Sequence, residues 1–280
     1  MFSVKKMSAE DIAFAVRITD TVNWNFTKKD FEFMLSLEPE GCFVLMHNSE
    51  KVGITTTVCF GKVGWVGNVI VSQNYRRRGA GTTLVKHAVN YLKLNGAETV
   101  GLYSYKETVN FYGKLGFKCD SEFTVLSGNA FSLLADETNM KKAKREEMQK
   151  IIDFDNFYFG ASREKLLEKI ASAEKNLCYY YVEDGETVGY VMAKVYEHYA
   201  EIGPLVCQKR RIDAAEALLK TVLSKLERFE VSMCIDAGAE ALVSMLLNAG
   251  FTERFSVLRM FSGPPAFREC IYAAESLERG

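Results

Sequence analysis

The stretch NVIVSQNYRRRGAGTTLVKHAVNYLKLNG, residues 68–96, decides the fold. It runs from an apolar segment into three consecutive arginines, Arg76–Arg78, then into Gly79-Ala80-Gly81 and a helical pattern. A strand that leads into a glycine loop and a helix aims successive backbone N–H groups, and the positive end of the helix dipole, at one spot. Glycines allow close approach, and arginines add charge that pairs with phosphate. The stretch therefore predicts an anion site, with pyrophosphate as its natural ligand.

Other interpretations of this loop stay open when the loop is taken alone. It lacks the Lys-Ser/Thr pair of a P-loop and the third glycine of a dinucleotide fingerprint, which disfavours both of those nucleotide sites. An arginine triplet is also typical of a solvated face or of a weak nucleic-acid patch.

The overall composition restricts the class of protein. The chain has 280 residues, of which 48% are hydrophobic and 25% charged, as in ordinary folded proteins, and its length favours two domains. A formal net charge of −1 gives no global field that would attract nucleic acid or an anionic membrane. No stretch approaches the roughly 18 uninterrupted apolar residues of a membrane span. We expect a cytoplasmic protein without a nucleic-acid or membrane partner.

Cysteine and histidine usage indicates neither a disulfide framework nor a metal site. The seven cysteines are odd in number and widely spaced, and they contain no C-x-x-C pair. The three histidines form no H-x-x-x-H pair. We expect reduced cysteines, mostly in the core, and no metal.

The chain contains an internal repeat. EKVGITTTVCFGKVGWVGNVIV (50–71) resembles ETVGYVMAKVYEHYAEIGPLVC (186–207), and FYGKLGFKCDSEFTVLSG (111–128) resembles MLLNAGFTERFSVLRMFSG (245–263). Self-similarity at such a period indicates duplicated structural units. We therefore expect two domains, 1–128 and 129–280, with Ser127-Gly128-Asn129 at the junction.

Hydrophobic periodicity predicts the elements of the first repeat. A mixed α/β sheet, mostly antiparallel and flanked by helices, is expected in each half. The helical face at 79–95 is the clearest, because Leu84, Val85, Ala88, Val89 and Leu92 recur at three- and four-residue steps. The expected strands are 2–6, 42–48, 52–60, 64–72, 98–104 and 117–126, with helices within 9–36, at 79–95 and at 107–115.

Two motifs together resemble the GNAT superfamily of acyl-CoA-dependent N-acetyltransferases. Arg76-Arg77-Arg78-Gly79-Ala80-Gly81 matches the signature Arg/Gln-x-x-Gly-x-Gly/Ala, and NFYGKLGF (110–117) matches the later Tyr-x-x-x-Gly-Phe element. The resemblance extends over the whole chain, because one subgroup carries two tandem GNAT-like domains. Its traits appear as NWNFTKKDFEFML, FDNFYFGASREKLL and LRMFSG.

The resemblance implies a site for acetyl-CoA as co-substrate in the first domain. The cleft would lie between splayed strands at 64–72 and 98–104, with Tyr112 as the general acid toward the departing thiolate, since a phenol is protonated at neutral pH. The implied co-substrate contacts are Val69, Ile70, Val71, Arg76, Arg77, Arg78, Gly79, Ala80, Gly81 and Thr82.

The general base is not assigned by the resemblance. Gly67 stands where many members carry a glutamate, and Tyr105 stands where many carry an asparagine. The candidates are Asp20, Glu107, Tyr105 and residues of the second domain. Trp24, between the first two helices, is a candidate for contact with the acceptor, although an aromatic residue there is also typical of a packing residue.

The second repeat has lost the phosphate loop. RRIDAAEALL (210–219) stands opposite YRRRGAGTTL, no glycine occurs between Pro204 and Ala237, and Leu246 replaces Tyr112. Asp213 and Glu216 suit a helix N-terminus but would repel a pyrophosphate. We expect this half to bind no CoA at the equivalent place and to help form the acceptor cleft.

The expected function is direct transfer of an acetyl group from acetyl-CoA to a primary amine of a small molecule or peptide. No cysteine pairs with a histidine as a nucleophile would, which disfavours a covalent intermediate. Two alternatives stay open. A non-catalytic acyl-CoA-binding regulator is motivated by Gly67, and nucleic-acid binding by Arg76–Arg78. The sequence indicates no oligomeric state.

Overall fold

The first half of the chain folds into the elements that its hydrophobic pattern predicts. In this computed structural model, which describes residues 1–130 and 138–280, the buried face of the long helix contains Leu84, Val85, Ala88 and Leu92, as expected. The strands are β1 (Phe2–Lys6), β2 (Cys42–His47), β3 (Glu50–Phe60), β4 (Val63–Val71), β5 (Thr99–Ser104) and β6 (Lys118–Asn129). The helices are α1 (Ile12–Asp20), α2 (Lys28–Leu37), α3 (Ala80–Leu94) and α4 (Val109–Gly113).

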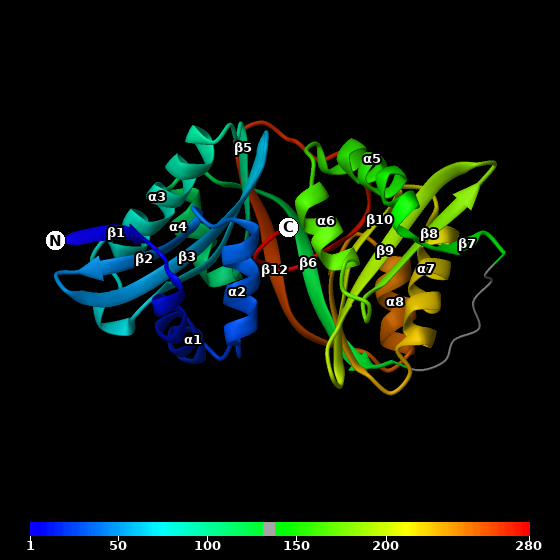
Figure 1. The fold of residues 1–280 in the computed structure, drawn as a ribbon, viewed down its shortest axis with the longest axis horizontal. Helices are drawn as coiled ribbons and strands as arrows, with labels where there is room; N and C mark the ends of the chain where they lie inside the picture. Colours follow the sequence, from blue (N-terminus) through cyan, green and yellow to red (C-terminus); the bar gives the residue numbers. More distant parts are fainter. Residues whose placement is uncertain (131–137) are drawn as a thin grey trace.

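The second half repeats this order, which confirms the internal repeat (Figure 1). Its helices are α5 (Met148–Phe159), α6 (Glu164–Ala171), α7 (Ile212–Lys225) and α8 (Glu240–Asn248). Its strands are β7 (Met140–Lys142), β8 (Leu177–Glu183), β9 (Glu186–Val195), β10 (Tyr199–Gln208), β11 (Glu230–Asp236), β12 (Thr252–Ser262) and β13 (Cys270–Ala274). Short 3-10 turns, η1 (Ala9–Asp11), η2 (Gln73–Tyr75), η3 (Lys106–Thr108) and η4 (Arg145–Glu147), precede α1, α3, α4 and α5.

The two halves share one sheet because they exchange their long strands. The order is β1-β2-β3-β4-β5-β12-β6-β11-β13-β10-β9-β8-β7, so β12 lies between β5 and β6, and β6 pairs with β11. Ser127, Gly128 and Asn129, expected at a junction, instead continue β6, with Ser127 opposite Ser232. The division at 128/129 stays a prediction, but neither half completes its sheet with its own strands.

A gap opens between β4 and β5, as the resemblance implies. The two strands are parallel and pair only from Val63 to Trp65, opposite Thr99 to Gly101. Beyond that point β4 continues to Val71 without β5 beside it. The edge of β4 that faces away from β3 therefore has no strand partner over its second half.

The equivalent gap in the second half is filled by the chain itself. β10 and β11 are parallel and pair from Tyr199 to Glu201, opposite Glu230 to Ser232. β13 then enters between them and pairs antiparallel with both strands. The second half thus satisfies with its own backbone the hydrogen-bonding groups that the first half leaves exposed.

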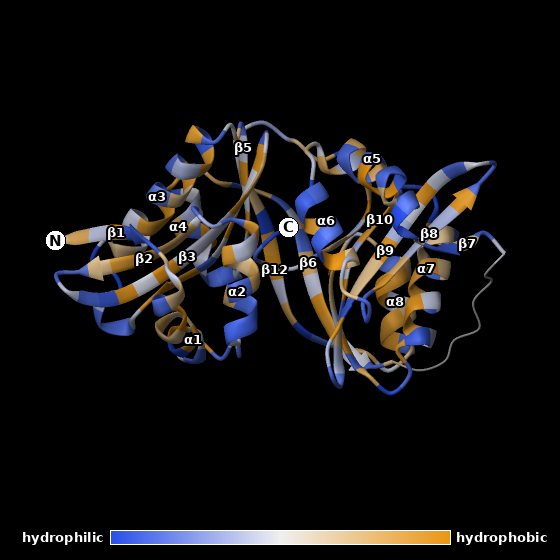
Figure 2. Ribbon diagram, in the orientation of Figure 1, coloured by the Kyte–Doolittle hydropathy of each residue, from blue (hydrophilic) through white to orange (hydrophobic). Residues whose placement is uncertain are grey.

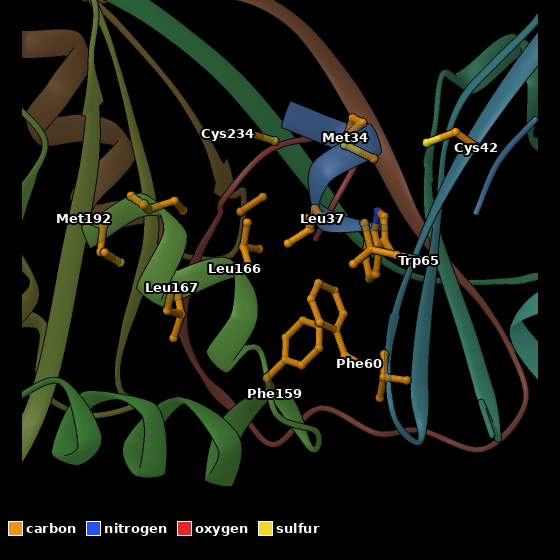
Figure 3. Close-up of a cluster of buried hydrophobic side chains, with 14 of the residues drawn as sticks. Met34, Leu37, Cys42, Phe60, Trp65, Phe159, Leu166, Leu167, Met192 and Cys234 are labelled. Carbon is orange, nitrogen blue, oxygen red and sulfur yellow. The ribbon is translucent and has the colours of Figure 1, made fainter. Parts of the chain in front are cut away.

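A shared apolar core joins the two halves. Phe60 of β3 meets Phe159 of α5 edge to face, with ring centroids 5.5 Å apart, and Leu37 of α2 lies across from Leu166 of α6 (Figure 3). These residues belong to one buried cluster that draws on both halves. Figure 2 shows apolar residues also along β6 and β12, the strands on which the halves meet. Burial of this shared surface holds the halves in a defined relation.

The cysteines are free, and Cys42, Cys178, Cys207 and Cys234 are buried, whereas Cys119 is exposed. Among residues 1–130 and 138–280 no helix is both long and apolar enough to cross a membrane. The same residues contain no cluster of three or more His, Cys, Asp or Glu side chains suited to a metal ion.

The Phe60–Phe159 contact generates a stability prediction. Phe159→Ala should lower the free energy of unfolding by about 3–5 kcal/mol, because it removes a ring from a closed core and leaves a cavity. Phe157→Ala is the control on the same helix, since its ring is 51% exposed, and it should cost about 1 kcal/mol or less. Urea unfolding followed by tryptophan fluorescence measures both. Equal losses in the two variants would contradict the assigned core.

Candidate active site

The loop before α3 presents a row of free backbone donors. Arg77 has a φ of 60° and Gly79, the residue before α3, a φ of 85°, so both lie in the left-handed region, and the chain turns sharply there. The N–H groups of residues 77–82 donate to no acceptor within the described residues, and the first bond into α3 is from the Thr83 N–H to the Gly79 oxygen, at 2.9 Å. Free donors at a helix N-terminus constitute an anion site.

The three arginines do not play the same part. Arg76 folds back, and its Nε donates to the Val71 oxygen at 2.8 Å, so it fixes the loop against the end of β4. Arg77 and Arg78 are exposed and form no hydrogen bond or ion pair within the described residues. Of the expected charge contacts, these two are the ones free to meet an anion.

The open edge of β4 presents Val69 and Val71 rather than Ile70. The Ser72 N–H donates to the Val52 oxygen, and Ile70 pairs with Ile54, so the even-numbered residues here direct their backbone groups at β3. Because backbone groups alternate along a strand, those of Val69 and Val71 face the gap. The pairing of β4 with β3 changes register between Gly67 and Ile70, where Asn68 has a φ of 51°. This irregularity changes which residues direct their backbone groups at β3.

Tyr112 lies on α4 beside the gap. It is buried between Phe111 and Phe117 and packs with Val66 of β4 and Leu102 of β5 in one cluster. Its hydroxyl forms no hydrogen bond within the described residues, and burial raises the pKa of Tyr112, so the phenol is protonated at neutral pH. The side chain therefore carries its proton at neutral pH and packs in a cluster that contains residues of both splayed strands.

Aromatic side chains of both halves meet near the end of β5. The rings of Trp24 and Tyr105 are 6.4 Å apart, and those of Tyr105 and Phe255 of β12 are 5.4 Å apart. Asn23 and Asn25, with φ near 55°, hold Trp24 in its loop. Sequence reasoning expected Trp24 on the acceptor side but missed Phe255, which only the strand exchange brings there.

Asp20, a weaker candidate, lies at the end of α1 and is exposed. Its side chain forms no ion pair or hydrogen bond within the described part of the chain. Burial raises the pKa of Tyr105, the other weak candidate, so its phenol is less acidic than usual.

The surroundings of Gly67 were not expected from the sequence. A Cβ atom on Gly67 would lie 2.7 Å from the Cα of Glu278 and 2.8 Å from its Cβ. The Trp65 Nε1 donates to the Leu277 oxygen at 3.2 Å. Residues 275–280, which follow β13, thus lie across β4 of the first half, and in Figure 1 the point marked C lies between the halves. We call residues 275–280 the bridging segment.

Buried charges fix the bridging segment. Glu275 pairs with Arg279 at 2.7 Å and with Lys194 of β9 at 2.6 Å. Burial by itself would raise the pKa of Glu275, but the two cations outweigh it and hold that pKa at about 2. The Arg163 Nη1 donates to the Gly280 oxygen at 3.0 Å. The segment is therefore held by the second half while it lies against the first.

The start of α7 differs from that of α3 as expected. Arg211 pairs there with Asp213 and Glu183, so its charge is neutralised by protein groups. β13 also occupies the gap beside β10. At Gly203, the repeat counterpart of Gly67, a Cβ atom would lie 2.0 Å from the Ala274 oxygen. These observations support the prediction that the second half binds no CoA at the equivalent place.

Both halves of the chain match one superfamily. Residues 11–117 match the acetyltransferase (GNAT) family, and residues 151–273 match an acetyltransferase (GNAT) domain. The chain belongs to the GNAT superfamily. Its two GNAT domains stand in tandem, and the loop and Tyr112 both lie within the first matched region.

Known proteins resemble this tandem GNAT chain in part or throughout. An uncharacterized N-acetyltransferase of Methanocaldococcus jannaschii is 28% identical over 102 residues, which are 31% of this chain and 43% of the relative, so the chain spans less than half of that relative. A crystal structure from Pyrococcus horikoshii aligns over 100% of this chain and 96% of its own, with 21% identity and a TM-score of 0.81. A tandem GNAT protein from the clavulanic acid biosynthesis pathway aligns over 95% of this chain and 100% of its own, with 14% identity and a TM-score of 0.64. The two structural similarities show the fold.

The charges around the bridging segment generate a pH prediction. The pKa of Glu275 is about 2 in the folded protein, against an ordinary 4.5, so its stabilisation is complete above pH 4.5 and is lost as the pH falls toward 2. Glu275→Gln should cost about 3–5 kcal/mol at pH 7, because it leaves buried cations without a partner, and this difference should shrink below pH 4.5.

Urea unfolding at several pH values measures this difference. Glu269→Gln, which removes an exposed carboxylate paired with Lys209, is the control and should leave the midpoint essentially unchanged. A difference between wild type and Glu275→Gln that stays constant down to pH 2.5 would show that the carboxylate is not held by these cations.

Proposed function

We propose that this GNAT protein is an acetyltransferase that uses acetyl-CoA to acetylate a primary amine. The observation that carries the proposal is the row of free N–H groups at residues 77–82, set directly after the open edge of β4. One end of this arrangement suits a pyrophosphate, and the other, at Val69 and Val71, suits the amides of an extended pantetheine arm that pairs like a strand.

The second half serves as an internal comparison for this fit. Its parallel strands separate in the same way, and there an extended backbone, β13, occupies the gap and bonds to both sides. The gap beside β4 thus exposes backbone groups that suit an extended chain with hydrogen-bonding amides. No described segment of the protein fills it.

Tyr112 would act as the general acid. The amine nitrogen attacks the thioester carbonyl, the carbon–nitrogen bond forms, and the carbon–sulfur bond breaks. The Tyr112 phenol, kept protonated by burial, donates its proton to the CoA sulfur and recovers one from the acylated nitrogen. No covalent intermediate on the protein is required.

The acceptor would approach past the aromatic side chains Trp24, Tyr105 and Phe255. Aromatic faces attract ammonium groups, so this surface suits an amine of a small molecule or a peptide. The residues come from both halves, which gives the second half a part in forming the acceptor cleft.

Gly67 favours a second candidate, an acyl-CoA-binding protein without turnover, because a glycine has no side chain that could act as a base. Release of free CoA thiol across a panel of amines separates the two candidates. Binding of acetyl-CoA with no thiol release on any amine would favour the binding protein.

Calorimetric titration with acetyl-CoA tests the location of the donor site. We expect one bound equivalent in the wild type and at least a 100-fold loss of affinity in Gly79→Asp, which places a carboxylate at the anion site. Gly185→Asp is a matched control, because Gly185 has the same φ of 85° and equally open surroundings, but lies in a turn of the second half. Its affinity should equal that of wild type. Two bound equivalents would contradict the assignment of the second half.

Tyr112→Phe tests the general acid. We expect kcat to fall about 100-fold or more, because the thiolate loses its proton donor, with the affinity for acetyl-CoA unchanged. Tyr103→Phe is the control, since Tyr103 is also a tyrosine with a buried hydroxyl that has no partner in the described structure, but it lies in the shared core. Its kcat should stay within twofold of wild type. Equal rates in the two variants would remove Tyr112 from the mechanism.

A further inference from the structure

Glu278 occupies the place that a side chain on residue 67 would take. The contacts of 2.7 Å and 2.8 Å from a Cβ on Gly67 are to the Cα, Cβ and carbonyl oxygen of Glu278. Only glycine at this position of β4 leaves room for the bridging segment. The second half thus places the backbone and Cβ of a glutamate against this position of β4.

The carboxylate of Glu278 is left without a partner although it stands among charges. Glu275 and Glu201 pair with the cations Lys194 and Arg279, and these four charges balance. Glu278 makes no hydrogen bond or ion pair within the described residues, and burial raises its pKa despite the nearby cations. Its side chain is half-buried, and a partly desolvated carboxylate without an ion pair costs stability, which a packing role alone would not require.

The Glu278 charge reaches the aromatic surface of the acceptor side. Burial is the main cause of the raised pKa of Tyr105, and the charge of Glu278 raises that pKa further. Tyr105 in turn contacts Trp24 and Phe255. The carboxylate therefore lies within electrostatic reach of the place where an amine would enter.

We propose that Glu278, carried across from the second half, is the general base of the first half's active site. This inference rests on the proposed acetyltransferase function. Glu278 takes one proton from the acceptor ammonium, and the free amine attacks the thioester carbonyl. Tyr112 protonates the departing sulfur and is reprotonated from the nitrogen. The products are the amide and the CoA thiol, and Glu278 returns its proton to solvent.

The other candidate bases are less suited. Asp20 and Glu107 are exposed, and nothing in the structure places either of them against β4. Tyr105 is a phenol whose pKa is raised, so it holds its proton at neutral pH. Among the candidates, Glu278 combines a half-buried setting, a carboxylate with no ion pair in the described structure and a position over β4.

The titratable groups around Glu278 come from several elements. They are Glu275 and Arg279 of the bridging segment, Lys194 of β9, Glu201 of β10, Cys234 of β11 and Tyr105 after β5. Glu275, Arg279 and Lys194 are ionised at neutral pH, because the opposite charges beside them lower the pKa of Glu275 and raise the pKa of Arg279 and Lys194. The thiol and the phenol are un-ionised there, because burial raises the pKa of each. An acidic limb in the rate above the ordinary carboxylate pKa of 4.5 would therefore report Glu278.

Glu278→Gln tests the proposal in the full chain. The change is isosteric and removes no hydrogen bond, so the unfolding temperature should not fall below that of wild type, and the affinity for acetyl-CoA should be unchanged. We expect kcat/KM for the amine to fall 100-fold or more at pH 7, and the acidic limb of the kcat profile to disappear. Glu253→Gln removes an exposed carboxylate from β12 and should keep the wild-type rate and profile. Wild-type rates in Glu278→Gln would overturn the proposal.

An NMR titration of the glutamate carboxyls tests the proposal without requiring turnover. In protein labelled with ¹³C at the glutamate carboxyls, the resonance missing from Glu278→Gln identifies Glu278. Its titration midpoint should lie above the ordinary 4.5. A midpoint at or below 4.5 would overturn the proposal. If wild type releases no thiol with any amine, the acetyltransferase function itself fails; if wild type is active and only the Glu278 results fail, the function stands and the base lies elsewhere.

Discussion

The antiparallel pairing of β12 with β6 is the contact on which the site depends. These are the two long strands that the halves exchange, and they lie side by side at the centre of the sheet. Because β12 pairs with β5, Phe255 reaches the acceptor side of the first half. The same pairing, with the shared core around Phe60 and Phe159, fixes the second half so that the bridging segment lies on β4. A hinge between independent domains would not hold such contacts.

The two repeats share one structural feature, a pair of parallel strands that separate, but they differ in what lies between the strands. Parallel strands that separate leave backbone donors and acceptors exposed, and these groups need partners. In the second half β13 supplies the partners, which stabilises that half without a ligand. In the first half the gap beside β4 stays open, next to a loop whose donors at residues 77–82 are also free. The chemistry that we propose follows from this difference in how the gap is filled.

The bridging segment connects the two halves electrostatically as well as sterically. Buried ions are stable only when paired, and Glu275, Arg279, Lys194 and Glu201 meet that condition together. Gly67 and Gly203 let the chain pass close to both copies of the same strand. Glu278 is then left without an ion pair among residues 1–130 and 138–280, against the strand position of Gly67.

The sequence by itself determined the repeat, the element order, the glycine loop at residues 76–82 before the long helix and the place of Tyr112, because each follows from a local pattern of periodicity or spacing. It predicted Trp24 as a candidate acceptor contact and Tyr105 as a candidate base, although not the contact between their rings. Only the tertiary structure decided the strand exchange, the entry of β13 and the meeting of Glu278 with Gly67. Alternating apolar residues specify which face of a strand is buried but not which strand lies beside it. Gly67 and Glu278 are 211 positions apart in the sequence, so they meet only when the sheet is assembled.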